Sequence, residues 1–248
     1  MPQPPSCSAC ADGQALPFEI SMAFQPIIDL DSGETYAHEA LVRGSQGEPA
    51  GLVLARVNDD NRYAFDQRCR TTAIEWATRL QIPARLSINF MPNAVYKPET
   101  CIRATLEAAR THGFPLERII FEVTEQERVT DTDHLLEILR AYRKQGFLTA
   151  IDDFGAGYAG LNLLAEFQPD LIKIDMALIR GIEADPVRQA IVESVLTMCQ
   201  RLDIRVIAEG VETREELLTL QGMGIGLFQG YLLARPGFES LPAISIPR

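Results

Sequence analysis

Short apolar runs that stop on a polar side chain recur along this chain, and they constrain its fold more than any other feature. The residues that close these runs are Glu39, Asn89, Glu122, Asp152 with Asp153, Lys173, Glu209 and Gln229. Buried strands of a parallel sheet are nearly continuous in Val, Ile, Leu and Ala. Barrel enzymes built from such strands carry their chemistry at the strand ends. The pattern therefore predicts a parallel sheet whose polar strand ends meet at one site.

Helix signals fill the gaps between these runs. We expect helices over residues 62–80, 99–112, 132–145 and 187–202. The last helix follows Asp185 as N-cap, with Pro186 at its first position. Thr213 and Glu216 form a capping box that opens a further helix. Strands and helices that alternate over this length indicate a parallel sheet covered by helices.

The first two strands are expected to be antiparallel neighbours. Residues 23–30 and 34–42 have strand patterns, and only a short turn at 31–33 separates them. Pro26 favours an edge position, because proline cannot donate to a sheet ladder. An open doubly wound sheet would gather its ligand groups at one switch point. Polar ends on nearly every strand instead favour a TIM-like (β/α)8 barrel with an antiparallel first strand.

The 248 residues fit one such domain, which we expect to span 18–248 after a disordered tail at 1–17 that is rich in Pro, Ser and Gly. No apolar stretch approaches the roughly 18–20 residues that cross a bilayer, and the chain does not begin with a secretory signal pattern. We therefore expect a cytoplasmic protein without a membrane segment. The net charge of −11 argues against DNA or RNA as partner. An anionic substrate remains compatible if a metal supplies positive charge.

The five cysteines give little evidence for a metal or redox centre. Cys69, Cys101 and Cys199 fall in helical patterns and are expected to be small buried apolar residues. Cys7 and Cys10 form a single CxxC that could bind zinc or do redox chemistry. No second CxxC or histidine pair lies at zinc-site spacing, so a reduced tail is favoured over a zinc site.

The acids and amides at the strand ends are hard oxygen ligands. If they meet, their negative charges repel one another unless protons or divalent cations compensate. Such donors suit Mg²⁺ or Mn²⁺ rather than zinc. The neighbours Asp152 and Asp153 could bridge two ions, and two metals about 4 Å apart form the usual clamp for displacement at phosphorus. Any one of these acids could instead cap a helix or pair with arginine, so the prediction rests on the set.

The same residues resemble the signatures of the EAL-domain phosphodiesterases. The matching segments, in order between about residues 20 and 236, are Gln25-Pro26, Glu39-Ala40-Leu41 with Arg43, Glu122-Val123-Thr124-Glu125, Asp152-Asp153-Phe154-Gly155, Lys173-Ile174-Asp175, Glu209-Gly210-Val211-Glu212 and Gln229-Gly230-Tyr231. The resemblance implies hydrolysis of cyclic di-GMP to linear pGpG with Mg²⁺ or Mn²⁺, in a TIM-like barrel whose first strand is antiparallel. It also implies a homodimer.

The resemblance further implies a role for each strand end. One metal would be held by Glu39, Asn89, Glu122 and Asp152, and the second by Asp152, Asp153 and Glu209. A water between the ions would be the nucleophile, with its pKa lowered by the metals. Lys173 would hold that water and stabilise charge on the phosphate. Glu209 could act as general base as well as ligand, and these two roles stay open.

Substrate binding and a regulatory loop are implied in the same way. Arg43 would contact a phosphate oxygen, and the other groove residues would be Gln25, Leu41, Asp175 and Gln229. The glycine-rich loop after Asp153 resembles the family's loop 6, which couples dimerisation to metal binding. Its residues here are Gly155, Gly157 and Tyr158, with Glu125 as anchor and Glu212 as a further supporting residue.

Other interpretations explain fewer of these residues. A Schiff-base role for Lys173 needs a lowered pKa in an apolar pocket, whereas the surrounding acids would raise it. The glycines at 155–160 superficially match GxGxxG, but Lys173 stands near where a dinucleotide site needs an acid. A sugar hydrolase would use two acids and leave Asn89 and Lys173 idle. A non-catalytic EAL module that binds cyclic di-GMP or a protein remains the alternative to the enzyme.

Overall fold

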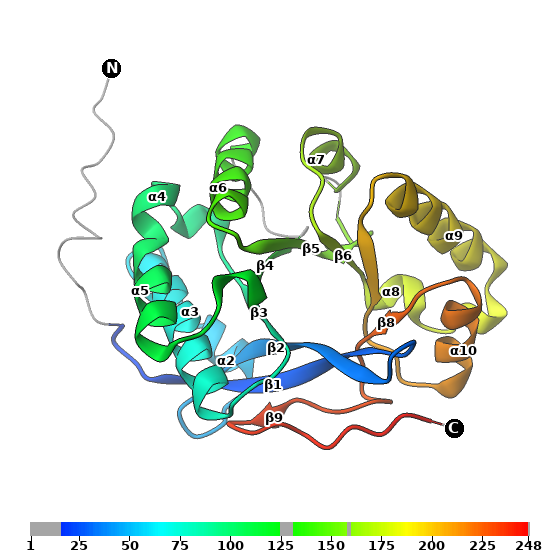
Figure 1. The fold of residues 1–248 in the computed structure, drawn as a ribbon, viewed down its shortest axis with the longest axis horizontal. Helices are drawn as coiled ribbons and strands as arrows, with labels where there is room; N and C mark the ends of the chain where they lie inside the picture. The colour runs from blue at the N-terminus through cyan, green and yellow to red at the C-terminus, as the bar shows by residue number, and fades with distance from the viewer. Residues whose placement is uncertain (1–15, 125–130, 158–159, 248) are drawn as a thin grey trace.

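The computed structural model describes residues 16–124, 131–157 and 160–247. Eight strands encircle the centre of the molecule and helices lie outside them (Figure 1). The barrel strands are β1 (Ile20–Asp29), β2 (Glu34–Gly44), β3 (Arg85–Asn89), β4 (Ile119–Thr124), β5 (Leu148–Phe154), β6 (Leu171–Ile174), β7 (Arg205–Ala208) and β8 (Leu227–Phe228). The predicted strands are therefore present, although β2 continues to Gly44. Arg43 thus lies within β2, because pairing with β1 continues beyond the apolar run.

Strand pairing closes the barrel with one antiparallel strand. Strands β2 to β8 pair in parallel in chain order. Strand β1 is antiparallel to both β2 and β8. The TIM-like barrel with an antiparallel first strand is confirmed. Pro26 lies between the residues of β1 that pair with β8 and those that pair with β9 (Gly237–Phe238), so a missing N–H is tolerated there.

The helices that cover the barrel largely follow the predicted ranges. They are α2 (Ala50–Leu54), α3 (Arg62–Arg79), α4 (Pro98–Cys101), α5 (Arg103–His112), α6 (Thr132–Lys144), α7 (Gly160–Glu166), α8 (Met176–Ile179), α9 (Pro186–Arg201) and α10 (Arg214–Gly222). The segment predicted as one helix over 99–112 is divided into α4 and α5. The interruption is slight, because Ile102 between them keeps helical angles, with φ −74° and ψ −15°.

Two predicted helix starts are confirmed at the level of hydrogen bonds. Asp185 accepts from the N–H groups of Val187 and Arg188 and so caps α9. Thr213 and Glu216 form the reciprocal capping box that opens α10. These caps begin the helices that precede and follow β7 in the chain.

An apolar layer fills the barrel interior and leads directly to the site. Its inward members include Ile27, Ala37, Ile120, Ala150, Leu171, Ile207 and Leu227. Side chains on a strand alternate between two faces, so the residue two positions away points into the same interior. Two residues further on stand Glu39 in β2, Glu122 in β4, Asp152 in β5 and Lys173 in β6, with Glu209 and Gln229 directly after β7 and β8. The barrel therefore places a polar layer immediately above an apolar one.

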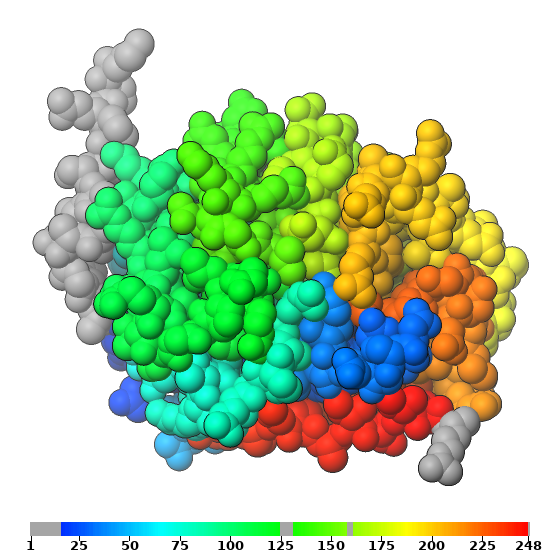
Figure 2. All heavy atoms as spheres, viewed as in Figure 1, coloured from blue at the N-terminus to red at the C-terminus, as the bar shows by residue number. Residues whose placement is uncertain are grey.

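The C-terminal segment runs along one side of the barrel. Figure 2 shows it as a continuous red band along the lower edge of the molecule. The N–H of Glu239 donates to the carbonyl of Met22, and the N–H of Ser245 donates to that of Leu233. Short 3₁₀ turns in the described part of the chain are η1 (Pro92–Ala94), η2 (Leu116–Arg118) and η3 (Ile182–Ala184). Within the described ranges, no helix is long and apolar enough to traverse a bilayer.

Candidate active site

The ammonium group of Lys173 lies at the centre of the polar layer. Its Nζ is 2.7 Å from Glu209 Oε1, 2.9 Å from Glu122 Oε2, 3.1 Å from Asp152 Oδ1 and 3.2 Å from Glu39 Oε2. The lysine side chain is 1% exposed. One buried cation thus contacts four carboxylates, which come from β2, β4, β5 and the residue after β7.

Amide and hydroxyl groups complete the hydrogen bonding around these acids. Asn89 Nδ2 donates to Glu39 Oε1 at 2.8 Å, and Gln229 Nε2 donates to Glu39 Oε2 at 2.7 Å. Ser87 Oγ donates to Glu122 Oε1. Gln229 Oε1 is buried and finds no hydrogen-bond partner within the described residues. That oxygen remains available to a ligand that carries a donor or a positive charge.

The carboxylates form two groups that share one member. Oxygen atoms of Glu39, Glu122 and Asp152 lie within 4.8 Å of one another, and so do oxygens of Asp152, Asp153 and Glu209. The two groups contain the acidic members of the two ligand sets that the resemblance implies, and Asp152 is common to both. Oxygen donors in this number and spacing suit hard divalent cations.

Burial and mutual repulsion make these acids reluctant to ionise together. Burial raises the pKa of Glu122 to about 8, despite the attraction of Lys173. Burial also raises the pKa of Glu209 well above its usual range. Burial alone would lower the pKa of the Lys173 ammonium, but the carboxylates around it, Asp152 foremost, hold that pKa well above its ordinary value. One ammonium therefore does not neutralise the cluster, and further protons or cations are favoured.

The adjacent aspartates differ in environment. Burial would raise the pKa of Asp152, yet Lys173 and the contact with Glu209 hold it below its usual value. Burial, followed by repulsion from Asp152 and Asp175, raises the pKa of Asp153 to about 6. The backbone of Asp153 has φ +53°, a left-handed conformation that side chains rarely adopt. Backbone strain of this kind concentrates at functional sites.

Three of the five predicted groove residues, Gln25, Asp175 and Gln229, line the cavity over the acids, whereas Leu41 and Arg43 do not. Glu39, Leu41 and Arg43 alternate on β2 and so share the face that points into the barrel. Gln25 stands opposite Glu39 on β1 and accepts from Gln229 Nε2 at 3.3 Å. A cavity of about 340 Å³ opens over Lys173 and includes Gln25, Glu39, Asp152, Asp153, Asp175, Glu209, Glu212 and Gln229 among its lining residues.

Asp175 and Glu212 have structural partners as well as a place on this cavity. The Asp175 carboxylate accepts from the N–H of Ala177 at 2.8 Å and caps α8. Glu212 pairs with Arg180 Nη2 at 2.9 Å at the rim. Met176 and Tyr231 also line the cavity, although they were not predicted to bind substrate.

The loop after β5 is only partly described. Gly155 has φ +99°, and a Cβ there would lie 2.6 Å from Leu178 Cδ1, so the position needs glycine on two counts. Gly157 is the last described residue before the gap at 158–159. Tyr158 and Glu125, the other predicted members of this region, lie outside the described residues.

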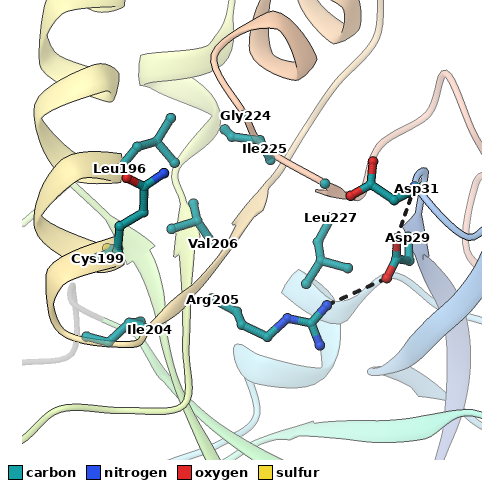
Figure 3. A pocket seen from close by; sticks show the side chains of 12 residues that line it. Asp29, Asp31, Leu196, Cys199, Ile204, Arg205, Val206, Gly224, Ile225 and Leu227 are labelled. Atoms are coloured by element: carbon teal, nitrogen blue, oxygen red, sulfur yellow. Dashed lines mark hydrogen bonds and ion pairs between the residues drawn. The ribbon is translucent and has the colours of Figure 1, made fainter.

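A second cavity lies at the opposite end of the barrel. It has a volume of about 240 Å³ and is lined by Arg205, Leu227 and Asp29 among others. Figure 3 shows the Arg205 side chain directed toward Asp29, and the apolar side chains of α9 and β7 lie across the cavity from Asp29. These residues begin β7 and β8 or end the antiparallel β1, so this cavity belongs to the amino-terminal face of the parallel strands. None of the predicted site residues lines it.

Ser87 donates a hydrogen bond to Glu122, but the pattern of polar strand ends did not predict it as a site residue. It precedes Asn89 by two residues and so shares its face of β3. The alternation within Leu86-Ser87-Ile88-Asn89 could have revealed it, because a serine at an inward position is unusual in an otherwise apolar strand.

Known proteins resemble this chain along most of its length. The EAL domain family matches residues 15–236. The blue light- and temperature-regulated antirepressor BluF of Escherichia coli K12 is 34% identical over 226 residues, covering 91% of this chain and 56% of BluF. The cyclic di-GMP phosphodiesterase PA2567 of Pseudomonas aeruginosa is 30% identical over 224 residues, covering 87% and 38%. The chain thus spans about half of these relatives or less.

Solved structures agree with the sequence matches. A standalone versatile EAL protein from Vibrio cholerae O395, in its c-di-GMP-bound form, superposes with a TM-score of 0.91 at 53% identity, covering 93% of this chain and 98% of that one. The manganese and cyclic di-GMP complex of BlrP1 from Klebsiella pneumoniae gives a TM-score of 0.85 at 38% identity, covering 91% and 58%. Together with the barrel and its acidic layer, these matches show that the chain is a member of the EAL domain family.

Proposed function

We propose that this protein is a metal-dependent phosphodiesterase that hydrolyses cyclic di-GMP to linear pGpG. The observation that carries the proposal is the pair of carboxylate groups that share Asp152 beside the buried ammonium of Lys173. The names of two relatives support the substrate: PA2567 is a cyclic di-GMP phosphodiesterase, and the Vibrio cholerae protein binds c-di-GMP.

The donor set fits two ions of Mg²⁺ or Mn²⁺. Glu39, Asn89, Glu122 and Asp152 would hold one ion, and Asp152, Asp153 and Glu209 the other. The unpartnered oxygen of Gln229 beside Glu39 supports a further polar ligand at this place. When bound, such ions would activate water at neutral pH and neutralise charge on a phosphate. BlrP1 in complex with manganese and cyclic di-GMP supports this choice of ion.

The side chains of the protein have separable tasks in this proposal. Lys173 stays charged at neutral pH and would donate to the attacking water or to a phosphate oxygen. Glu209, whose raised pKa lets it carry a proton, would accept a proton from the water or serve as a ligand. Without cations, the carboxylates would repel the phosphates of the substrate.

Groove residues would orient the dinucleotide over this centre. Arg43 lies two positions beyond Leu41 on the inward face of β2 and would contact a phosphate oxygen. The amides of Gln25 and Gln229, together with Asp175, would supply hydrogen bonds. Gly155, Gly157 and Tyr158 would belong to the loop that couples dimerisation to metal binding, with Glu125 as its anchor and Glu212 as a further supporting residue.

Turnover of cyclic di-GMP tests the proposal directly. Purified protein is incubated with cyclic di-GMP and Mg²⁺ or Mn²⁺, and products are separated by ion-pair chromatography. We expect pGpG with wild type and none with Glu39→Ala or in EDTA. Calcium should support binding with little turnover, because its larger and looser coordination sphere positions the water poorly.

The alternative is a non-catalytic module that binds cyclic di-GMP or a protein partner. The antirepressor BluF, an EAL relative with a regulatory name, is the observation in its favour. Saturable binding of cyclic di-GMP without pGpG in either metal would establish this receptor and overturn the enzyme. Light scattering with and without metal would test the homodimer that the resemblance implies, and limited proteolysis would test the boundary near residue 18.

A further inference from the structure

A buried ion pair lies behind the barrel wall, outside the active-site cavity. Asp66 and Arg70, both on α3, are 2% and 0% exposed. Arg70 Nη2 is 2.7 Å from Asp66 Oδ2, and Arg70 Nη1 donates to the hydroxyl of Tyr142 on α6 at 2.6 Å. The motifs of the sequence analysis include none of these three residues. The pair therefore needs an explanation of its own.

Aromatic rings connect this pair to two strands of the site. The guanidinium carbon of Arg70 lies 5.1 Å from the ring centroid of Phe121 and 5.5 Å from that of Phe90. Phe90 directly follows Asn89, and Phe121 directly precedes Glu122. Because alternate residues of a strand face opposite sides, Phe121 packs against Arg70 on the outside while Glu122 points into the barrel.

A direct hydrogen bond connects the pair to the chain just after Asn89. The N–H of Met91 donates to Asp66 Oδ1 at 2.9 Å. The intervening Phe90 donates its N–H to the carbonyl of Glu122 at 3.0 Å. The backbone that leaves Asn89 is thus held by α3 on one side and by β4 on the other.

Stability alone does not explain a charged pair at this place. Removing two ions from water costs several kcal/mol, and apolar pairs of similar volume are often at least as stable. Arg70 Nε has no hydrogen-bond partner among the described residues, and Nη2 meets Asp66 as an ion pair outside hydrogen-bond geometry. The contacts that an apolar residue at 66 could not replace are the hydrogen bond from the N–H of Met91 to Asp66 Oδ1 and the one from Gln67 Nε2 to Asp66 Oδ2 at 3.2 Å.

We infer that Asp66 is a positioning residue for the first metal site, acting through Met91 on Asn89, while Arg70 compensates its buried charge. The inference rests on the proposed function, in which Asn89 is a ligand. Residues that orient metal ligands typically change metal affinity by about 10- to 100-fold when they are removed. Asp66 touches neither metal nor substrate in this proposal.

Two double variants separate positioning from stability. Asp66→Asn with Arg70→Met removes both charges but keeps a side-chain oxygen that can accept from Met91. Asp66→Leu with Arg70→Met removes the charges and the acceptor, and Leu has nearly the branched shape of Asn. Thermal midpoints in EDTA establish that both variants fold, and Mn²⁺ affinity is then measured on the full chain by electron paramagnetic resonance of the free ion.

We expect the Asn variant to bind Mn²⁺ as wild type does and the Leu variant to bind about 10-fold more weakly or worse at one of two sites. Amide hydrogen exchange at residues 89–91 should be faster only in the Leu variant. Tyr142→Phe, which removes the acceptor for Arg70 but spares Met91, should lower the thermal midpoint without changing Mn²⁺ affinity.

The outcomes distinguish the two proposals. If wild type binds Mn²⁺ and both double variants bind it equally, the positioning role is wrong and the proposed function stands. If wild type binds no Mn²⁺, both are wrong. If the Leu variant does not fold, the single variant Asp66→Asn, which keeps the acceptor beside Arg70, takes its place. Amide exchange at residues 89–91 in this variant should remain at the wild-type rate. Faster exchange there would overturn the role of the acceptor.

Discussion

Lys173 Nζ lies 2.7 Å from Glu209 Oε1, and the two side chains are 1% and 15% exposed. The same ammonium also contacts the carboxylate that is common to both acidic groups, Asp152. This geometry gives Lys173 two tasks that can be separated by experiment. It compensates buried negative charge when metal is absent, and it is positioned for charge development at phosphorus in the proposed reaction.

Lys173→Met should destabilise the metal-free protein and abolish turnover. Removing one partner of a buried ion pair typically costs about 3–5 kcal/mol, because the other charge remains buried. Mn²⁺ should restore much of this loss, since the added cations compensate the same carboxylates, but it should not restore hydrolysis. Urea unfolding in EDTA and in Mn²⁺ measures both effects, with the exposed Lys144→Met as control. Equal stability of wild type and Lys173→Met in EDTA would contradict the compensating role.

The stability of the metal-free protein should fall as pH rises from about 4.5 to about 8. Burial raises the pKa of Glu122 from its usual 4.5 to about 8, so the folded protein holds this proton more tightly than the unfolded chain does. Stability from this group is therefore complete below pH 4.5 and is lost as pH rises through 8. The lowered pKa of Asp152 acts in the opposite direction, and its stabilisation is lost only as pH falls below the usual 3.8.

Thermal midpoints across this pH range in EDTA, and again in Mn²⁺, measure the effect. Bound cations should remove the decline, because they favour the ionised carboxylates at high pH. Glu122→Gln is the control and should show a shallower decline in EDTA. A wild-type profile that rises from pH 5 to 8 without metal would contradict the raised pKa of Glu122.

Asp153→Asn should stabilise the fold and weaken the second metal site. Asparagine tolerates the left-handed φ of +53° at this position. Above the raised pKa of about 6, the carboxylate is ionised next to Asp152, so the neutral amide should relieve repulsion. The side chain is only half enclosed, so after allowance for solvent screening the gain is roughly 1 kcal/mol. Calorimetry should show a smaller increase in midpoint on adding Mn²⁺ than wild type shows, and an equal increase would exclude Asp153 as a ligand.

The barrel and the acidic layer could be predicted because both follow from local pattern. Strand alternation puts Leu171 and Lys173 on one face, and the same rule puts Ile120 and Glu122 on one face. The motif order then distinguishes a metal site from unrelated buried acids. Asp185 and Thr213 were predictable because helix caps depend only on neighbouring residues.

Burial that depends on packing between residues far apart in the sequence could not be predicted in the same way. Asp66 and Arg70 lie four residues apart on α3 and resemble an ordinary surface ion pair in the sequence. Only the packing of Phe90, Phe121 and Tyr142 around Arg70 makes the pair buried. The sequence places Arg43 just after a strand, because the apolar residues end at Val42. In the structure, pairing with Ser21 keeps Arg43 within β2.

Glu216→Ala should cost more stability than Thr213→Ala, although both belong to one capping box. Thr213 accepts from a single N–H, that of Glu216, and loss of such a cap costs about 1 kcal/mol. The Glu216 carboxylate accepts from the N–H groups of Gly181, Glu212 and Thr213, so its removal leaves three donors unpaired. We expect about 2–3 kcal/mol, measured by urea unfolding. Equal losses in the two variants would show that the contacts beyond the cap are weak.

Gly230→Ala should disrupt the site through the backbone rather than through a lost contact. A Cβ at Gly230 would lie 2.0 Å from the carbonyl oxygen of Val211 and 2.4 Å from its nitrogen, so either segment must shift. Val211 donates its N–H to the carbonyl of Gln229, which means that the shift would displace the side chain next to Glu39. We expect a loss of about 3 kcal/mol or more in stability and weaker binding of cyclic di-GMP in any molecules that remain folded.

The matched control for this substitution is Gly222→Ala. Gly222 ends α10, and a Cβ there would meet nothing within 4 Å. Alanine should therefore raise stability by about 0.5–1 kcal/mol, because it reduces the freedom of the unfolded chain and favours the helix. Differential scanning calorimetry of both variants, followed by isothermal titration with cyclic di-GMP, measures the contrast. If Gly230→Ala unfolds and binds as Gly222→Ala does, the close approach of Val211 does not position Gln229.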